Sequence, residues 1–192
     1  VVVMVNTWLD FEVFTTHHLQ PRQEKMIVTA ADSARRTVIE LNAEPAAAEY
    51  ARLVGVPLER LDHDTFARHA LAVKIGGQYY VRSIQRVNPD LSLSFYCAVE
   101  TGIVLTAMAP GPMLPDLDRV FAGIAGRLGR PMLIIGCDCF LRRLEAECDQ
   151  FVPASSRFLS QHRVIGFNTY GEQYNGMHIN QTFTGVALAC PE

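Results

Sequence analysis

The sequence predicts an α+β fold, with antiparallel or mixed β-sheet layers and flanking helices. Short segments rich in Val, Ile and Thr are separated by turn residues, which is typical of antiparallel strands. Only a few segments show the apolar spacing of an amphipathic helix. The expected order is hairpin, helix, meander, helix, strand, helix and hairpin, and this order differs from the regular alternation of a doubly wound parallel sheet.

In the first half of the chain, the clearest element is a helix that follows residue 43. Asn42 is placed to cap it, Pro45 suits its first turn, and Gly55 suits a left-handed C-terminal cap. A second, shorter helix is expected at 58–69, and residues 7–24 form a mixed segment that ends in a polar loop. Apolar and β-branched runs predict strands at 1–6, 25–30, 36–41, 71–75, 79–86, 93–99 and 103–108.

Three regularly spaced turn signals, at 76–77, 88–90 and 100–102, predict an antiparallel meander. In the second half, helices are expected from Asp116 and from near Phe140, and Pro153 breaks the second of them. The remaining strands are expected at 132–136, 164–170 and 182–188, the last two forming a hairpin. Since no linker composition divides the chain, residues 1–192 are interpreted as one domain.

The composition is ordinary for a globular domain, with 49% hydrophobic residues and a net charge of −3. This balance leaves no strong positive field for a nucleic-acid partner, and no apolar run reaches the roughly 18 residues that span a bilayer. Five cysteines, several in apolar surroundings, indicate reduced thiols and a cytoplasmic protein. An apolar segment without an initial Met leads us to expect a cut point at residue 1, with an N-terminal half before it.

The most informative segment is the loop at 166–182, between the last two strands. Its candidate ligand-binding residues are Tyr170, Gly171, Glu172, Asn180 and Thr182. Such a loop can aim carboxylate and amide groups into a cleft beside a sheet, or it can be a tight turn whose side chains bond their own backbone. His178 in the same loop could ligate a metal or haem iron. The alternative for His178 is a hydrogen-bonded loop residue.

A second candidate site lies where the strand at 132–136 leads into a helix. Its residues are Cys137, Asp138, Cys139, Arg142 and Arg143. A strand end that opens onto a helix N-terminus is a usual place for an anionic ligand, and Cys139 there could have a depressed thiol pKa. The cysteine spacing matches no standard zinc pattern, and the alternative is a strand end packed in the core. The histidines outside the loop, including His17 and His18, are interpreted as solvated or structural.

The sequence carries no familiar catalytic pattern. It has no GxSxG elbow, no GxxxxGK[ST] phosphate loop, no GxGxxG after a strand and no HExxH pair. Glu172 and His178 could act as acid and base, but no nucleophile is marked beside them. We therefore do not predict an enzyme.

Several ordered segments resemble the C-terminal half of the FIST family of sensory proteins. In residues 29–55, a strand and the segment Asn42-Ala43-Glu44-Pro45-Ala46 lead into a helix that ends in Val54-Gly55, although the family usually has Asp-Gly at Asn42-Ala43. The other similar segments are 80–84, 90–93, 136–143 and 166–182. The likeness covers about residues 7–190, and the order and spacing of the segments make it specific.

The resemblance implies an intracellular sensory domain that binds a small ligand beside an N-terminal FIST domain. It also implies signalling to a histidine kinase, a chemotaxis receptor or a cyclic-nucleotide enzyme. Residues 88–98 and 171–185 resemble a bacterial branch, the nitric-oxide-sensing haem proteins of the NosP type. That likeness implies haem b, with His178 on the iron and Arg142 or Arg143 on the propionates.

Two other interpretations remain open. In the first, the ligand is an amino acid or similar metabolite, whose carboxylate pairs with Arg142 or Arg143 and whose ammonium pairs with Glu172. In the second, the chain is a protein-interaction domain without a small ligand.

Overall fold

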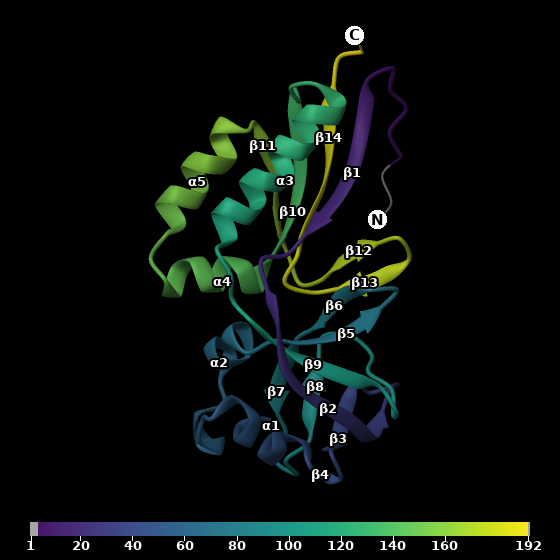
Figure 1. Cartoon of the computed structure of the whole chain (residues 1–192), viewed down its shortest axis with the longest axis vertical. Helices are drawn as coiled ribbons and strands as arrows, with labels where there is room; N and C mark the ends of the chain where they lie inside the picture. Colours follow the sequence, from purple (N-terminus) through teal and green to yellow (C-terminus); the bar gives the residue numbers. More distant parts are fainter. Residues whose placement is uncertain (1–3, 192) are drawn as a thin grey trace.

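Residues 4–191 are the part of the chain that the computed structural model describes, and their strands form two large sheets and a hairpin (Figure 1). The upper sheet has the strand order β1-β14-β10-β11, and its bounds are Asp10–Thr16, Phe183–Ala189, Leu133–Cys139 and Val164–Thr169. The lower sheet has the order β6-β5-β9-β2-β3-β8-β7, with bounds Gln78–Arg82, Leu71–Ile75, Val104–Ala109, Gln20–Asp32, Thr37–Leu41, Leu93–Phe95 and Ile84–Val87. The short β4, Glu44–Pro45, pairs with β3. The hairpin of β12, Glu172–Tyr174, and β13, Met177–Ile179, lies between the two sheets.

The upper sheet is mixed. β10 and β11 are parallel, and the chain passes between them through α4, Phe140–Cys148, and α5, Val152–Gln161. β14 pairs antiparallel with both β1 and β10. This combination of parallel and antiparallel pairs confirms the predicted α+β class.

Helix α3, Met113–Leu128, packs with α5 over one face of the upper sheet (Figure 1). Its apolar face joins sheet residues in a core of Phe14, Leu117, Phe121, Ile124, Ile134, Phe183 and Ala187. Side chains alternate between the faces of a strand. Phe11 and Val13 of β1 and Ile165 and Phe167 of β11 therefore lie on the opposite face, where they are exposed.

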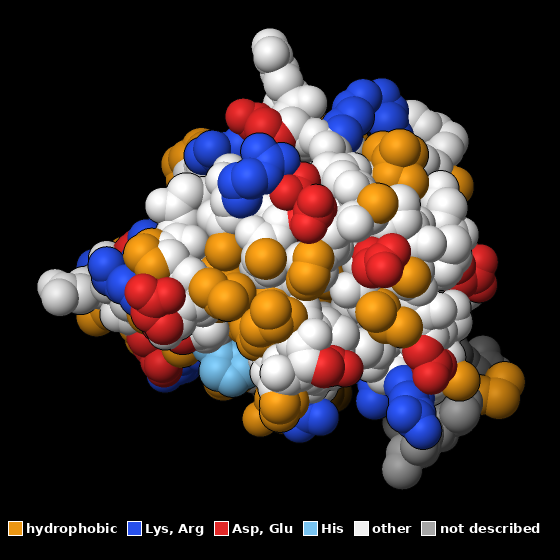
Figure 2. Space-filling model, turned by 90° about the horizontal axis from the view of Figure 1, so that it is seen from below, with side chains coloured by type: hydrophobic (Ala, Val, Ile, Leu, Met, Phe, Trp, Pro, Cys, Tyr) orange, Lys and Arg blue, Asp and Glu red, His pale blue; other side chains and the backbone are white. Residues whose placement is uncertain are grey.

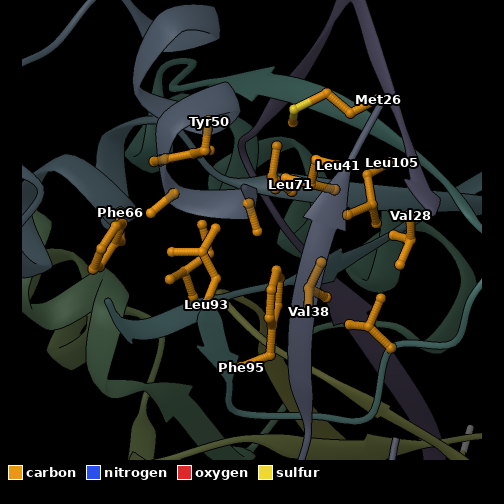
Figure 3. Close-up of a cluster of buried hydrophobic side chains, with 14 residues drawn as sticks. Met26, Val28, Val38, Leu41, Tyr50, Phe66, Leu71, Leu93, Phe95 and Leu105 are labelled. Carbon is orange, nitrogen blue, oxygen red and sulfur yellow. The ribbon is translucent and has the colours of Figure 1, made fainter. Parts of the chain in front are cut away.

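The lower sheet holds the larger core. Helix α1, Ala46–Val54, covers it together with the short helices η1, Leu58–Arg60, and α2, His63–Arg68. Figure 3 shows the packed side chains, which include Met26, Val28, Val38, Leu41, Tyr50, Phe66, Leu71, Leu93, Phe95 and Leu105. Burial of this many large apolar side chains supplies the main driving force for folding the lower half.

The cap at the end of α1 follows the sequence prediction. Gly55 has a φ of 72°, in the left-handed region, and its N–H donates to the carbonyl of Ala51 at 2.9 Å. The predicted cap at the other end is wrong, because Pro45 occupies the N-cap position and makes no side-chain cap bond. Asn42 instead accepts a hydrogen bond from the Ile27 N–H at 2.9 Å and donates to Glu49 at 2.7 Å.

Other differences from the predicted elements concern strands. The strand expected at 1–6 is not formed at residues 4–6, and residues 1–3 lie outside the described part. The segment 7–24 contains β1 and the start of β2. The predicted meander is broken, because β8 pairs with β3 and β7 while β9 pairs with β2 and β5. The last two predicted strands do not form a hairpin, because β10 lies between β11 and β14.

The surface mixes charge with apolar side chains. Figure 2 shows acidic and basic side chains interspersed over the lower end of the molecule, with hydrophobic side chains gathered between them. Within the described residues, no helix combines the length and the apolar character needed to cross a membrane.

Candidate functional site

The strand β10 separates the predicted site residues onto two sides of the upper sheet. Side chains alternate along a strand, so Asp138 faces the helices while Cys137 and Cys139 face the other side. The register agrees, because Asp138 is opposite Phe183, a core residue under α3, and Cys137 is opposite Thr184. The predicted set is therefore divided into a helix-side group and a hairpin-side group.

The helix-side group borders a cavity of about 370 Å³ between β10, β11, α4 and α5. Asp138, Arg142 and Arg143 line it together with Ser155, Ser156 and Asn168, while Met113, Val164 and Phe183 supply apolar wall. Cavities of this size and mixture of polar and apolar lining are typical of small-ligand sites.

Arg142 belongs to a buried chain of charged and polar groups. Its Nε donates to Asp138 at 2.7 Å, and its Nη1 lies 3.1 Å from Nδ1 of His18. His18 Nε2 in turn lies 2.8 and 2.9 Å from the two carboxylate oxygens of Glu145. Because a guanidinium only donates hydrogen bonds, His18 accepts at Nδ1 and donates from Nε2–H, which assigns its tautomer.

The Asp138 carboxyl combines burial with a positive neighbour. Burial raises its pKa, and the adjacent Arg142 guanidinium opposes that rise. Its side chain stays 22% exposed, unlike the 2% of Arg142, so the carboxylate reaches the cavity. Arg143 is exposed on α4, where it pairs with Glu147 at 2.6 Å. One wall of the cavity therefore carries both an acidic and a basic group.

The hairpin-side group surrounds Glu172 at the start of β12. Glu172 is buried, and its carboxylate accepts hydrogen bonds from the hydroxyls of Thr169 and, at 2.6 Å, Thr182. Burial raises the pKa of Glu172, and the two hydroxyls oppose the rise. Glu172 bonds these threonines and does not line the cavity that Arg142 and Arg143 border, so the cavity does not combine Glu172 with these arginines as the predicted amino-acid site requires.

The two cysteines of β10 are not activated thiols. Burial raises the pKa of Cys139 to about 12, and burial and the Glu172 carboxylate raise the pKa of Cys137. A thiol reacts as its thiolate, so both groups are poor nucleophiles at neutral pH. The depressed pKa expected for Cys139 is therefore wrong, because burial outweighs its position at the start of α4.

The remaining loop residues lie at the hairpin. Tyr170 is 71% exposed, with its ring 5.4 Å from that of Phe140. Asn180 is buried and accepts a hydrogen bond from the Ser83 N–H at 3.3 Å. Gly171 has a φ of 148°, and a Cβ there would lie 2.1 Å from His178 Nε2. Glycine is therefore required at this close approach.

The surroundings of His178 do not fit a haem ligand. Burial and the nearby Arg82 and Arg36 lower its pKa, which favours the neutral imidazole that binds iron. However, Nε2 lies against the Gly171 backbone, and His178 does not line the cavity described above. In residues 4–191, no group of three or more His, Cys, Asp or Glu side chains is arranged to hold a metal ion. Haem binding at His178 stays a prediction.

Sequence reasoning missed two members of the buried chain. His18 and Glu145 are separated by 127 residues and meet only because β1 and α4 lie at the same end of the upper sheet. His18 is only 1% exposed, so of the two interpretations of the histidines outside the loop, the structural one applies to it. One feature of the sequence could have indicated this chain of contacts: Glu145 lies three residues after Arg142, on the same inward face of an amphipathic helix.

Comparison with protein-family models gave two matches along the chain. A FIST C domain model matches residues 46–175, and a FIST N domain model matches residues 1–44. The chain belongs to the FIST family. FIST domains are sensory, ligand-sensing domains of signalling proteins. Comparison with curated proteins and with solved structures gave no match.

The FIST N match ends at Glu44 in β4, and the FIST C match begins at Ala46, the first residue of α1. The FIST N match covers β1, β2 and β3, which supply strands to both sheets. Residues assigned to the two models therefore share one core in the lower half.

Proposed function

We propose that this FIST protein senses a small zwitterionic metabolite, such as an amino acid, in the cavity between α4, α5, β10 and β11. The observation that carries the proposal is the pair of opposite charges on one wall, Asp138 and Arg143, in a cavity of about 370 Å³. An amino acid presents an ammonium and a carboxylate close together, and charge-assisted hydrogen bonds to both are strong and orienting.

Each charged group has capacity for a ligand. Arg142 engages one Asp138 oxygen through its Nε, and the other oxygen can accept from a ligand ammonium. In the described part of the chain, Arg143 is held only by an exposed pair with Glu147, an interaction worth little in water, so exchange for a ligand carboxylate costs little. Ser155, Ser156 and Asn168 add neutral hydrogen-bonding groups. In this version Asp138, rather than Glu172, binds the ammonium.

The buried chain offers a route from the cavity to the lower half. Arg142 joins Asp138 to His18, and His18 lies between β1 of the upper sheet and β2 of the lower sheet. A ligand whose ammonium binds Asp138 weakens the attraction between Asp138 and Arg142. That change would shift the equilibrium between different arrangements of the two sheets. By family likeness, we propose a histidine kinase, a chemotaxis receptor or a cyclic-nucleotide enzyme as the receiver of the signal.

Two rival versions remain proposals with less support. Haem with nitric oxide as the signal follows from the sequence likeness alone, since the surroundings of His178 do not favour it. A protein-interaction domain without a small ligand would leave the cavity unused. The same experiment separates all three versions.

The test is a thermal-shift screen with amino acids, related metabolites and hemin, followed by calorimetry on each hit. A true ligand raises the melting temperature by mass action. We expect an amino-acid hit whose affinity falls about tenfold or more in Arg143→Gln, because one charge-assisted bond is lost. Arg157→Gln, exposed on α5 and outside the cavity lining, is the matched control and should bind normally.

A second variant, Asp138→Asn, tests the ammonium contact, with circular dichroism to confirm the fold. Binding that survives both Arg143→Gln and Asp138→Asn would remove the cavity from the proposal. A sharp Soret band with hemin, weakened by His178→Ala, would favour the haem version instead.

A further inference from the structure

Arg82, at the end of β6, has an environment that differs from those of the other arginines. Three arginines of the described chain are not exposed, namely Arg68, Arg82 and Arg142. Arg68 pairs with Asp64 and Asp149, and Arg142 pairs with Asp138. Within residues 4–191, Arg82 has no carboxylate within salt-bridge distance. A partly buried charge without a counter-charge is costly, and binding of an anion would offset that cost.

Hydrogen bonds connect the end of β6, which carries Arg82, with three other segments. Arg82 Nη1 donates to the carbonyl of His178 in β13 at 2.5 Å. The Tyr96 N–H donates to the carbonyl of Ser83, the next residue after Arg82, at 3.0 Å. Arg36 Nη1 donates to the carbonyl of Tyr96 at 3.1 Å. These bonds join the segments that carry Arg36, Arg82 and His178 at the junction of the lower sheet and the β12–β13 hairpin.

A second basic side chain at the junction is also unmatched. Arg36 is exposed, and among residues 4–191 its side chain bonds only a backbone carbonyl, so its charge is available to a ligand. Both arginines depress the pKa of His178, in addition to the effect of burial. They also oppose the burial that raises the pKa of the Cys97 thiol. The charges of Arg36 and Arg82 therefore both act on the His178 ring.

The buried Asn180 amide provides an independent observation that points to a ligand. Asn180 is 1% exposed, and its Nδ2 finds no hydrogen-bond partner in the described chain. Its Oδ1 accepts from the N–H of Ser83, which places the amide beside Arg82. Nδ2 of Asn180 lies close to Gly171. A Cβ at position 171 would be 3.1 Å from this nitrogen and 2.1 Å from His178 Nε2. Buried donors are nearly always satisfied, so an unpaired one points to an acceptor that binds there.

We propose that Arg36, Arg82, His178 and the Asn180 amide bind the oxyanion group of a small ligand, a phosphoryl or carboxylate group. Every member is a donor or a cation, and guanidinium groups match the oxygens of both anions. The site lies against the hairpin and shares no residue with the cavity between α4 and α5. Its test is therefore independent of the metabolite proposed for that cavity.

The site also gives the β12–β13 hairpin a binding role. An oxyanion that bridges Arg36 and Arg82 of the lower half to His178 of the hairpin would tie the hairpin to the lower sheet. Such a ligand adds contacts between segments that meet through Arg82 and the His178 carbonyl and through the Ser83 N–H and Asn180. Occupancy then stiffens the junction between the two sheets.

The experiment is an NMR titration of the 192-residue chain with inorganic phosphate and, separately, with acetate. Sodium chloride of matched ionic strength is the control for screening. We expect saturable shifts of the backbone amides of Arg82, His178 and Asn180 with phosphate, acetate or both. The anion that produces them identifies the group that the site prefers.

Variants test the assignment. Arg36→Gln removes an exposed charge that bonds one carbonyl, so the fold should persist, and the affinity should fall at least about tenfold. His178→Gln should weaken binding as well. Arg86→Gln, an exposed arginine of β7 in the same sheet, is the matched control. Shifts absent with both anions, reproduced by chloride, or equally weakened in Arg36→Gln and Arg86→Gln would overturn the proposal.

Discussion

Arg142 and Arg143 are neighbours in α4 with opposite surroundings. Arg142 is 2% exposed and bonds Asp138 and His18, whereas Arg143 is about half exposed and bonds only Glu147. A buried ion pair has already lost its hydration, so removing one partner leaves the other charged and unsolvated. An exposed pair is solvated and screened, so its removal costs little.

Replacing each arginine by methionine tests this contrast. We expect Arg142→Met to lower the free energy of unfolding by about 3–5 kcal/mol, because Asp138 and His18 each lose a buried partner. Arg143→Met should stay within about 1 kcal/mol of the wild type. Urea denaturation followed by circular dichroism measures both values. Equal losses of unfolding free energy in the two variants would mean that the buried hydrogen bonds of Arg142 stabilise the fold no more than the exposed pair of Arg143 does.

For individual residues, the sequence identified many of the polar groups at the candidate sites but not which of them lie next to one another. The segment 137–143 lies at the end of β10 and the start of α4, as predicted, and Glu172 and Thr182 do bond each other. The alternation of side chains along a strand is by itself enough to separate Asp138 from the two cysteines of β10. The sequence could not place His18 beside Arg142, because 124 residues separate them and only the pairing of β1 with β14 brings them together.

Helix α2 depends on a single cap because it is only six residues long. The Asp62 carboxylate accepts from the Thr65 N–H at 2.9 Å, and that backbone donor lowers the pKa of Asp62. A short helix has few internal hydrogen bonds, so the loss of one satisfied terminal donor matters. The cap is also the start of the helix that packs against α4.

We expect Asp62→Ala to cost about 1 kcal/mol of unfolding free energy at neutral pH. The folded pKa of Asp62 is lowered, so its contribution is present above the unfolded pKa of about 3.9 and is lost as the pH falls through the folded value. The difference between wild type and variant should therefore shrink in acid. Urea melts at several pH values measure it, with Glu59→Ala in the neighbouring η1 as the control. A difference that grows in acid would contradict the cap.

Helices were predicted better than strand partners, and the reason is physical. Local signals mark α1, α3 and α4, namely apolar spacing, Pro45 and Gly55. The strands after residue 70 were found, but their order was not, because pairing is decided by contacts far away in sequence. The turn at 100–102 reverses the chain without joining paired strands, since β2 and β3 insert between β9 and β8.

The two halves of the molecule meet through buried polar contacts as well as through the connecting chain. Gln181 is fully buried, and its Nε2 donates to the carbonyl of Ala67 in α2 at 2.7 Å. The Ser83 hydroxyl donates to the Gln181 Oε1 at 3.3 Å. Arg68 of α2 also reaches Asp149 after α4 at 2.5 Å. Contacts of this kind favour joint unfolding of the two sheets.

Gln181→Ala tests whether the sheets unfold together. The substitution leaves the Ala67 carbonyl and the Ser83 hydroxyl without their partner, and a buried unsatisfied group costs about 1–3 kcal/mol. If the halves are coupled, native-state hydrogen exchange should report one global free energy for the slowest amides of β10 and β9, and that value should fall equally in both strands. Gln173→Ala, exposed on β12, should change neither. A loss confined to β10, or different wild-type values for the two strands, would mean that each sheet is an independent folding unit joined by a loose hinge.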